Sequence, residues 1–586
     1  MVEFFLCMES FIEIDHVDYL YTGTASQPLP ALQDISLRID EGEWVALVGA
    51  NGSGKTTLAR HIDGLLLPTH GTVRVAGMDT RQRDKLKQIR GLVGMVFQSP
   101  EEQVVATTVE EDVAFGAENL CLPEEDIRCR VEEILRQMGL WEERQRPPHL
   151  LSAGQMQRLA LAGVLVMQPR AIVFDEATTM LDPIGRRSAM ERLRQLHAQG
   201  ITILFVTHHM EEAARAERLI ALDQGHLAWD GTPQDFFAQA ALVGRLGLEQ
   251  PPAAQAANQL RTIFPGLPGE LLLEEQLLAS LPSPHHQRQA TVKNGTMFDP
   301  ASSKPSLIEV QALEHIYLKD TPLARQALKE ASLQVTPHHA HALAGATGSG
   351  KSTLLQHLNG VLRPQSGTVW VGRFDLSDPK LDGKAVCQLA GLVMQNPELQ
   401  FFEQFVGDEI AYGPRQMGLK TGIAQRVRWA MEQVRLDFDA YKDRMTYTLS
   451  GGEKRKVALA SILAIKPEIL LLDEPTAGLD PRSRREVLGM LVRLKADGMT
   501  LVFSSHQMED VATLADEMTV FQQGTTVASG KTSDVFYGEA ELAGSGLFPP
   551  LAVSVANVLH QKGWNLPGGI TCMEQLLPEL RREAGV

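Results

Sequence analysis

One long segment of this sequence occurs twice, with the second copy about 297 residues after the first. Gly-Ala-Asn-Gly-Ser-Gly-Lys-Thr at 49–56 recurs as Gly-Ala-Thr-Gly-Ser-Gly-Lys-Ser at 345–352. Leu-Pro-Gly at 267–269 recurs at 566–568, so the likeness continues to the end of each copy. A period this long is a duplicated domain rather than a solenoid unit. The chain is therefore expected to fold as two similar halves.

The repeat also predicts how the chain divides into domains. We expect a first domain at 9–245 with a small C-terminal module at 246–281, and a second domain at 307–543 with its module at 544–586. Residues 282–306 separate the halves and are rich in Pro, Ser, His and Asn-Gly, without an apolar period. Such a composition is typical of a flexible tether.

The composition of the chain excludes or disfavours several classes of function. The formal net charge is -17 over 586 residues, which argues against a nucleic-acid partner because binding to phosphate backbones relies on a basic surface. The five cysteines have no zinc or iron–sulfur spacing, so free thiols in a reducing compartment are expected. No stretch approaches about 20 consecutive apolar residues. We expect a soluble chain, whose work at a membrane would need separate subunits.

Each glycine-rich copy follows an apolar run and precedes a stretch with helical character. Strand, loop and helix form the context that a phosphate-binding loop requires, because its backbone N–H groups and the helix N-terminus favour an anion. Lys55 and Lys351 would neutralise phosphate oxygens, and Thr56 and Ser352 would offer a hydroxyl to Mg²⁺. The candidate nucleotide-binding residues here are Gly49, Asn51, Gly52, Ser53, Gly54, Lys55, Thr56 and Thr57, and Gly345, Thr347, Gly348, Ser349, Gly350, Lys351, Ser352 and Thr353.

Two apolar runs, at 171–174 and 469–472, end in Asp-Glu. Runs that are apolar throughout indicate buried parallel strands, and ligands bind at the carboxyl ends of such strands. Asp175 and Asp473 suit contact with Mg²⁺. Glu176 and Glu474 suit the role of a general base that polarises the attacking water.

Taken together, these motifs resemble the ATP-binding cassette superfamily: a phosphate loop, a glutamine, a Leu-Ser-x-Gly signature, an Asp-Glu strand and a histidine. The resemblance implies an α/β fold with two tandem P-loop nucleotide-binding domains, each with a helical subdomain and a small C-terminal module. It implies ATP and Mg²⁺ as cofactors. It also implies that the two halves pair within one chain and form two composite ATP sites.

The resemblance assigns further roles residue by residue. Gln98 and Gln395 match the loop glutamine that contacts Mg²⁺, and His208 and His506 match the histidine that contacts the γ-phosphate, which makes them catalytic candidates beside Glu176 and Glu474. The signature candidates, expected to cover the γ-phosphate of the opposite half, are Ser152, Gly154, Gln155, Ser450, Gly451, Gly452 and Glu453. Tyr21 and Tyr317 match the aromatic residue that stacks on adenine, although core packing is the alternative. Asp182 and Asp480 match the aspartate at the seam between halves.

The first copy departs from the common pattern without losing a reacting group. Ala153 replaces a signature glycine, and Ala177 stands where the second copy has Pro475. Because Lys, Asp, Glu and His remain in both copies, we expect two competent sites.

Gln-x-Pro-x-x-Gln at 98–103 and 395–400 points to one branch of the superfamily. This pattern and the C-terminal modules are similar to the ATPase subunits of energy-coupling factor transporters, with two such ATPases fused. That resemblance implies uptake of a vitamin or a transition-metal ion. It also implies a membrane coupling protein and a substrate-binding membrane protein as partners, and a peripheral location on the cytoplasmic face of the cell membrane.

Three alternatives remain open: an ATPase of another importer, a tandem cassette protein acting on ribosomes, and a DNA-repair ATPase. The acidic charge and short linker argue against the ribosomal role, and the absence of zinc spacing and long heptads argues against repair. Carboxylates beside the glutamines are expected to face arginines of the coupling protein. They are Glu101, Glu102, Glu398, Asp408 and Glu409.

Overall fold

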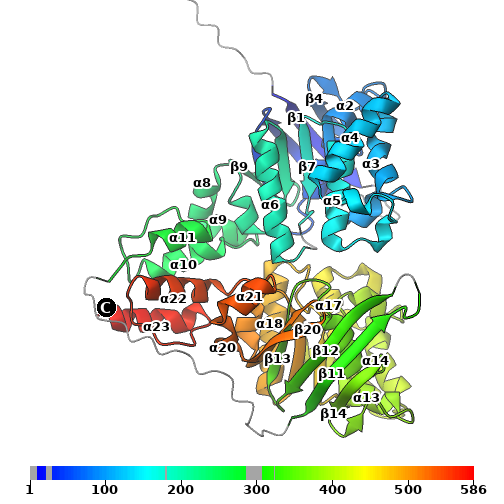
Figure 1. The fold of residues 1–586 in the computed structure, drawn as a ribbon. Helices are drawn as coiled ribbons and strands as arrows, with labels where there is room; N and C mark the ends of the chain where they lie inside the picture. The colour runs from blue at the N-terminus through cyan, green and yellow to red at the C-terminus, as the bar shows by residue number, and fades with distance from the viewer. Residues whose placement is uncertain (1–9, 22–28, 179–180, 285–305, 322–323, 586) are drawn as a thin grey trace, which may run out of the picture. The chain divides into compact units, whose positions relative to one another are not determined.

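A computed structural model describes residues 10–21, 29–178, 181–284, 306–321 and 324–585. It divides into two compact units (Figure 1). Unit 1 comprises residues 1–258 and 268–279, and unit 2 comprises residues 259–267 and 280–586. The expected linker at 282–306 lies mostly outside the described residues, and the predicted domain boundaries stay predictions.

Unit 1 contains two β-sheets. In the six-stranded sheet, with order β10-β9-β3-β8-β7-β6, all neighbouring strands are parallel except β10 with β9. The four-stranded sheet has the order β2-β1-β4-β5 and is antiparallel. The strands are β1 (Ile12–Tyr21), β2 (Leu29–Ile39), β3 (Trp44–Gly49), β4 (His70–Val75), β5 (Met78–Asp79), β6 (Val93–Val96), β7 (Ala171–Asp175), β8 (Thr202–Val206), β9 (Arg218–Asp223) and β10 (His226–Gly231).

Unit 2 repeats this arrangement. Its sheets have the orders β16-β17-β18-β13-β19-β20 and β12-β11-β14-β15. The strands are β11 (Ile308–Tyr317), β12 (Arg325–Val335), β13 (Ala340–Ala344), β14 (Ser366–Val371), β15 (Phe374–Asp375), β16 (Ala390–Val393), β17 (Ile469–Leu472), β18 (Thr500–Ser505), β19 (Glu517–Gln522) and β20 (Thr525–Lys531). The α/β fold expected for both halves is thus confirmed.

The helices also correspond between the units. An insert of helices lies between the glutamine segment and the signature in each unit, as the sequence predicts. In unit 1 the helices are α1 (Lys55–Ile62), α2 (Leu86–Leu92), α3 (Val109–Asn119), α4 (Glu124–Gln137), α5 (Ala153–Leu165), α6 (Pro183–Ala198) and α7 (Met210–Ala213). In unit 2 they are α12 (Lys351–Leu358), α13 (Gly383–Leu389), α14 (Val406–Gln416), α15 (Ile423–Gln433), α16 (Phe438–Tyr441), α17 (Gly451–Leu463), α18 (Pro481–Ala496) and α19 (Met508–Leu514).

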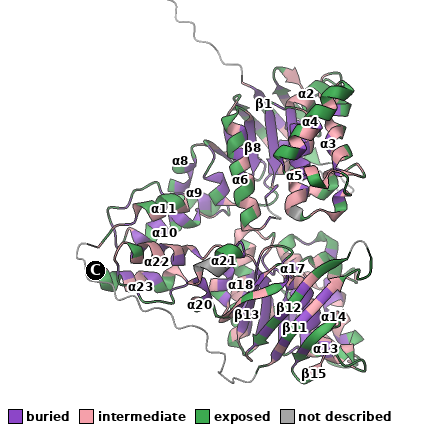
Figure 2. Cartoon of the chain, in the orientation of Figure 1, coloured by how far each residue is buried: buried purple, intermediate pink, exposed green. Residues whose placement is uncertain are grey.

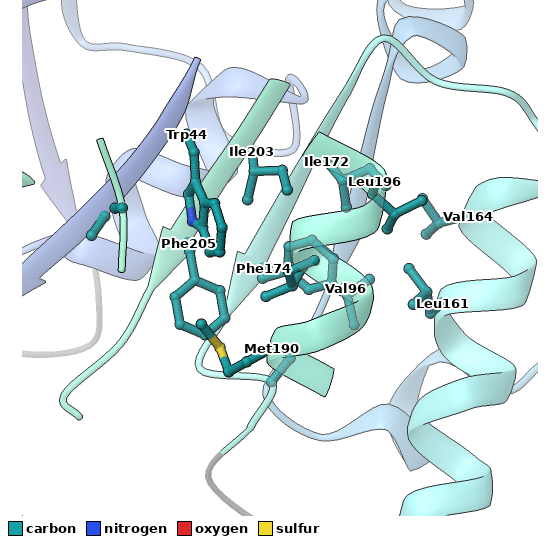
Figure 3. Packing of buried hydrophobic residues seen from close by; sticks show 14 of the residues in the cluster. Trp44, Val96, Leu161, Val164, Ile172, Phe174, Met190, Leu196, Ile203 and Phe205 are labelled. Carbon is teal, nitrogen blue, oxygen red and sulfur yellow. The ribbon is translucent and has the colours of Figure 1, made fainter. Parts of the chain in front are cut away.

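Apolar residues of the parallel strands form the core of each unit, where the strands are mostly buried (Figure 2). In unit 1, Phe174 and Phe205 from the sheet pack with Met190 of α6 and Leu161 of α5 (Figure 3). Full burial of one such side chain stabilises the fold by roughly 1.5–3 kcal/mol. This packing fixes the strand ends that carry the candidate site.

Small helices follow the last strand of each unit: α8 (Pro233–Ala238), α9 (Ala240–Arg245), α10 (Pro252–Leu260), α11 (Glu274–Ser280), α20 (Thr532–Phe536), α21 (Glu539–Gly544), α22 (Leu551–Gln561) and α23 (Met573–Ala584). Of these, α10, α11, α22 and α23 lie within the ranges expected for the C-terminal modules. Within unit 2 the Phe264 ring meets the Trp564 ring edge-on at 5.2 Å, and Trp564 Nε1 donates to Pro282 O at 2.8 Å. Residues 259–267 thus fold with unit 2, although the repeat places them in the first copy. Among the residues that the structure describes, no helix has the length and apolarity needed to span a membrane.

Candidate functional site

In both units the glycine-rich loop joins a central strand to a helix. It joins β3 to α1 in unit 1 and β13 to α12 in unit 2. Gly54 has φ +102°, and a Cβ there would lie 2.5 Å from Ala31 O, so only glycine fits. Gly350 is in the same situation, at φ +106° and 2.7 Å from Ala327 O. The loop backbone is therefore built as the sequence predicts.

The loop lysines are held by the loop itself. Lys55 Nζ donates to Gly49 O and Ala50 O, both at 3.0 Å. Lys351 Nζ donates to Gly345 O at 2.8 Å and Ala346 O at 2.9 Å. Burial lowers the pKa of Lys55, against the raising effect of Glu176 and Asp175. A buried cation at a helix N-terminus is a suitable place for a phosphate group.

A buried hydroxyl group in the first loop is also suited to binding a phosphate group. Ser53 Oγ is buried and makes no hydrogen bond to the described residues. A buried polar atom without a partner is costly, and a phosphate oxygen would satisfy it.

Beside each loop, a hydroxyl and a carboxylate lie together. Thr56 Oγ1 donates to Asp175 Oδ1 at 2.9 Å, and Ser352 Oγ donates to Asp473 Oδ1 at 3.0 Å. Burial raises the pKa of both carboxyl groups. Within the described ranges no group of three His, Cys, Asp or Glu residues could hold a metal. One carboxylate and one hydroxyl fit Mg²⁺, since this ion keeps several waters and takes phosphate oxygens as further ligands.

The second acidic residue of each strand end faces a histidine. Glu474 accepts from His506 Nδ1 at 2.9 Å, whereas His208 Nδ1 lies 3.6 Å from Glu176 Oε2. Gln98 Nε2 donates to that same oxygen at 3.1 Å, while Gln395 is exposed. Both glutamates adopt left-handed backbone conformations, with φ +50° at Glu176 and +47° at Glu474. Left-handed strain at non-glycine residues is typical of functional sites.

Electrostatics keep these glutamates ionised. Burial pushes the pKa of Glu176 upward, but the nearby His208 and the charge of Lys55 outweigh it and the pKa falls below its ordinary value. The pKa of Glu474 is lowered in the same way by His506, against burial. An ionised, fixed carboxylate can orient and deprotonate a water molecule.

The two aromatic candidates lie next to the loop helices. The hydroxyl groups of Tyr21 and Tyr317 are 3.2 Å from Thr57 Oγ1 and Thr353 Oγ1. Tyr19 supports the ring of Tyr21 edge-on at 5.0 Å, and His315 supports that of Tyr317 at 4.6 Å. Both tyrosines are well exposed, at 40% and 37%. The rings are therefore accessible to a stacking base.

The signature residues begin helices α5 and α17. Ser152 and Gln155 form a reciprocal capping box, and Ser450 and Glu453 form the same box in unit 2. Hydrogen bonds from Tyr441 and Ser450 outweigh burial and lower the pKa of Glu453 to about 2. Asp182 and Asp480 cap the N-termini of α6 and α18. Thr179 and Met180, which stand where the second copy has Ala477 and Gly478, lie outside the described residues.

One expectation about the docking carboxylates is wrong. Glu409 is only 2% exposed, because its carboxylate folds back to accept from Phe402 N and Glu403 N at 2.8 Å each. Glu398 and Asp408 remain at the surface, paired with Lys454 and Arg415. A run of acidic residues at the start of a helix is usually exposed to solvent. Here one of them, Glu409, instead accepts hydrogen bonds from the backbone of the preceding loop.

Each unit has a further buried carboxylate, Glu212 or Asp510, which was not predicted from the sequence. Glu212 accepts from Thr178 Oγ1 at 2.9 Å and Thr207 Oγ1 at 2.7 Å. Asp510, at the same place in unit 2, accepts from Thr476 Oγ1 at 2.5 Å and from Arg484. Each ties the segment after the Asp-Glu pair to the segment that carries the histidine. The sequence does contain a signal for this pair, because an acidic residue follows the histidine by four residues in both copies.

Comparison with known proteins settles the family. The family described as ABC transporter matches residues 32–179 and 328–477. The chain is a tandem ABC ATPase. An ABC transporter ATP-binding protein of Methanosarcina mazei, provisionally assigned, is 32% identical over 583 residues, covering 97% of this chain and 96% of its own.

Two further relatives match about half of the tandem ABC ATPase. The energy-coupling factor transporter ATP-binding protein EcfA1 of Caldanaerobacter subterraneus is 44% identical over 272 residues, covering 46% of this chain and 98% of its own. The solved structure of cbiO1 from Clostridium perfringens, described as part of the ABC transporter complex cbiONQ, is 30% identical. It covers 41% of this chain and 93% of its own, with a TM-score of 0.36.

Proposed function

We propose that this tandem ABC ATPase hydrolyses ATP to drive an importer of the energy-coupling factor type, taking up a vitamin or a transition-metal ion. The observation that carries the proposal is the complete set of reacting groups in both units. Each has a buried loop lysine, an Asp with a hydroxyl partner, and an ionised Glu beside a His. The 44% identity to an energy-coupling factor ATPase supports the choice of transporter type.

The roles follow from position and charge. Lys55 and Lys351 would hold the β- and γ-phosphates, with the loop N–H groups and Ser53. Thr56 with Asp175, and Ser352 with Asp473, would hold Mg²⁺, joined by Gln98 and Gln395. Bound Mg²⁺ would offset negative charge on the phosphates. Glu176 and Glu474 would take the proton of the attacking water, and His208 and His506 would keep those carboxylates oriented.

Each loop is proposed to work with the signature of the other half, so that Lys55 pairs with Ser450 and Lys351 pairs with Ser152. Paired variants test this directly. Lys55→Ala with Ser450→Ala damages one site, so its ATPase activity should equal that of Lys55→Ala alone. Lys55→Ala with Ser152→Ala damages both sites, so its activity should be much lower. The reverse order of the two activities contradicts the pairing.

The proposed partners are a membrane coupling protein and a substrate-binding membrane protein, with the chain on the cytoplasmic face of the cell membrane. Large apolar side chains beside the glutamine segments support a docking surface. They include Leu399 and Phe402 of unit 2, which are 72% and 70% exposed, and Val105 of unit 1, at 60%. Exposed apolar patches of this kind mark interaction sites.

Purification of the tagged chain from native membranes in mild detergent tests the transport role. We expect two integral membrane proteins to co-purify, and substrate uptake in proteoliposomes to depend on ATP. The alternative outside transport, a tandem cassette protein acting on ribosomes, predicts ribosomal subunits in the purified fraction instead. Recovery of ribosomes without membrane proteins contradicts the proposal.

A further inference from the structure

Unit 1 has a cavity of about 260 Å³ between helix α5, helix α6 and the end of the six-stranded sheet. Leu161, Phe174 and Phe205 give it an apolar lining (Figure 3). Its other lining residues include two arginines, Arg158 of α5 and Arg192 of α6. The cavity therefore combines an apolar surface with two positive charges and one acid, Asp182, whose carboxylate accepts from Gly185 N at 2.7 Å.

Among the described residues, neither arginine pairs with a carboxylate. Arg158 donates to Gly154 O at 3.3 Å and Met138 O at 2.9 Å, and Arg192 donates to Met138 Sδ at 3.2 Å. In the part of the chain that the structure describes, no carboxylate oxygen lies within 4.0 Å of either guanidinium group. Burial, with a further contribution from the charge of Arg158, lowers the pKa of Arg192. Two arginines that line one cavity and pair with no described carboxylate favour the binding of an anion there.

Unit 2 supplies a carboxylate of its own at the corresponding place. The repeat matches Arg158 to Lys456 and Ser188 to Glu486. Lys456 Nζ donates to Glu486 Oε2 at 2.6 Å, so a carboxylate of α18 neutralises the cation of α17. Glu486 also accepts from Arg482 Nε at 3.4 Å.

Unit 1 has smaller side chains at two of the corresponding positions and no carboxylate at a third. Ala189 stands at the place of Val487, which is 1% exposed, and Gly185 stands at the place of Ser483. Arg192 stands where Met490 is buried at 2% exposure. Space has therefore opened in unit 1 at the position where the equivalent cation of unit 2 meets an acid.

We propose that this cavity binds a small organic carboxylate with an apolar body. Its acid group would take the place that Glu486 fills in unit 2, and would accept from Arg158 and Arg192. Guanidinium groups bind carboxylates through paired, charge-assisted hydrogen bonds. The apolar body would lie against Leu161, Phe174 and Phe205. The volume is near the lower end for ligand pockets, which limits the ligand to a small molecule.

Occupancy would also affect the neighbouring signature. Ser152, Gly154 and Asp182 line the same cavity, so a bound acid would contact the starts of α5 and α6. A change in ATPase activity on binding rests on the proposed function, whereas binding itself does not.

Calorimetric titration of the full chain tests binding without reference to activity. Benzoate is the carboxylate probe, phenyl phosphate tests a phosphate in its place, and benzyl alcohol is the uncharged control. We expect benzoate to bind at least about tenfold more tightly than benzyl alcohol, a difference of about 1.4 kcal/mol. Benzyl alcohol binding as well as benzoate, tighter binding of phenyl phosphate than benzoate, or no binding of benzoate overturns the proposal.

Two variants locate the site. Ser188→Glu supplies the internal carboxylate of unit 2 and should abolish benzoate binding while raising the melting temperature. Arg192→Met installs the residue of unit 2 and should weaken binding at least about tenfold without that internal carboxylate. The matched control is Arg194→Met, which removes an exposed cation of the same helix and should leave binding unchanged. Benzoate binding that persists unaltered in both cavity variants overturns the assignment.

Discussion

At the scale of single residues, the site is organised around one glutamate in each unit. Glu176 and Glu474 follow buried strands, adopt left-handed backbone conformations and face a histidine. Such strained conformations persist only where the surrounding structure fixes them. The carboxylates are therefore positioned by the fold, before any ligand is considered.

The glutamate pKa values predict a pH dependence. Since the pKa of Glu474 lies below its ordinary 4.5, the ionised form stabilises the fold above pH 4.5 and is lost as pH falls through the lowered value. His506→Ala removes the strongest of the interactions that oppose burial and leaves the charges of Lys351 and Arg455, so the pKa of Glu474 should rise. In a Glu176→Gln background, the acid limb of the ATPase pH profile should move to higher pH. An acid limb that stays in place contradicts the assignment of His506 as the partner.

For the buried aspartates, ionisation is expected to destabilise the fold, the opposite of its effect for the glutamates. Burial raises the pKa of Asp473 above 3.8, so its ionised form is disfavoured in the fold. The cost to stability grows as pH rises from 3.8 and is complete above the raised value. Asp473→Asn should raise the melting temperature at pH 7 without Mg²⁺ or nucleotide, yet reduce Mg²⁺-dependent hydrolysis. Asp497→Asn, at the exposed end of α18, is the control and should change neither. A lower melting temperature for Asp473→Asn contradicts this account.

At the scale of elements, one acid in each unit holds the segment after the glutamine, buried in unit 2 and half-buried in unit 1. Glu409 accepts from two backbone N–H groups, and Asp112 does the same for Val105 N at 2.8 Å and Ala106 N at 3.2 Å. In unit 2 this segment presents Phe402, whose ring stacks on Tyr412 at 4.9 Å. The acid therefore shapes the proposed docking surface rather than contacting the partner.

Glu409→Ala should leave the two N–H groups without partners and loosen that segment. We expect weaker association with the membrane subunits, measured by co-purification, and unchanged nucleotide affinity. Asp408→Ala removes the neighbouring exposed acid and should have a much smaller effect, since surface ion pairs contribute about 0–1 kcal/mol. Equal effects of the two variants would point to charge instead of loop shape.

The features that could be predicted from the sequence are those that depend on a local pattern of residues. The strand, loop and helix around each phosphate loop and the Asp-Glu strand ends were predicted because each depends on a short stretch of sequence. The burial of Glu409 and Glu212 was not found, since it depends on which N–H or hydroxyl donors the fold brings near. Packing of residues 259–267 within unit 2 depends on contacts with Trp564, which no local pattern reveals.

At the scale of the whole molecule, the duplication supplies two sets of reacting groups in one chain. The tether between them is expected only to raise the effective concentration of one half for the other. Cleavage at a protease site inserted near Gln289, which lies outside the described residues, should leave ATPase activity of the assembled transporter largely intact. Loss of all activity after clean cleavage would show that the tether has a more specific role.

The central claim is that Glu176 and Glu474 carry out hydrolysis in a chain with two ATP sites. The most direct measurement is ATPase activity of the full chain carrying both Glu176→Gln and Glu474→Gln, alongside nucleotide binding. We predict a fall of roughly 10²–10⁴-fold in turnover with binding retained, because a positioned general base contributes about that much. Turnover near that of the unaltered chain would contradict the catalytic assignment.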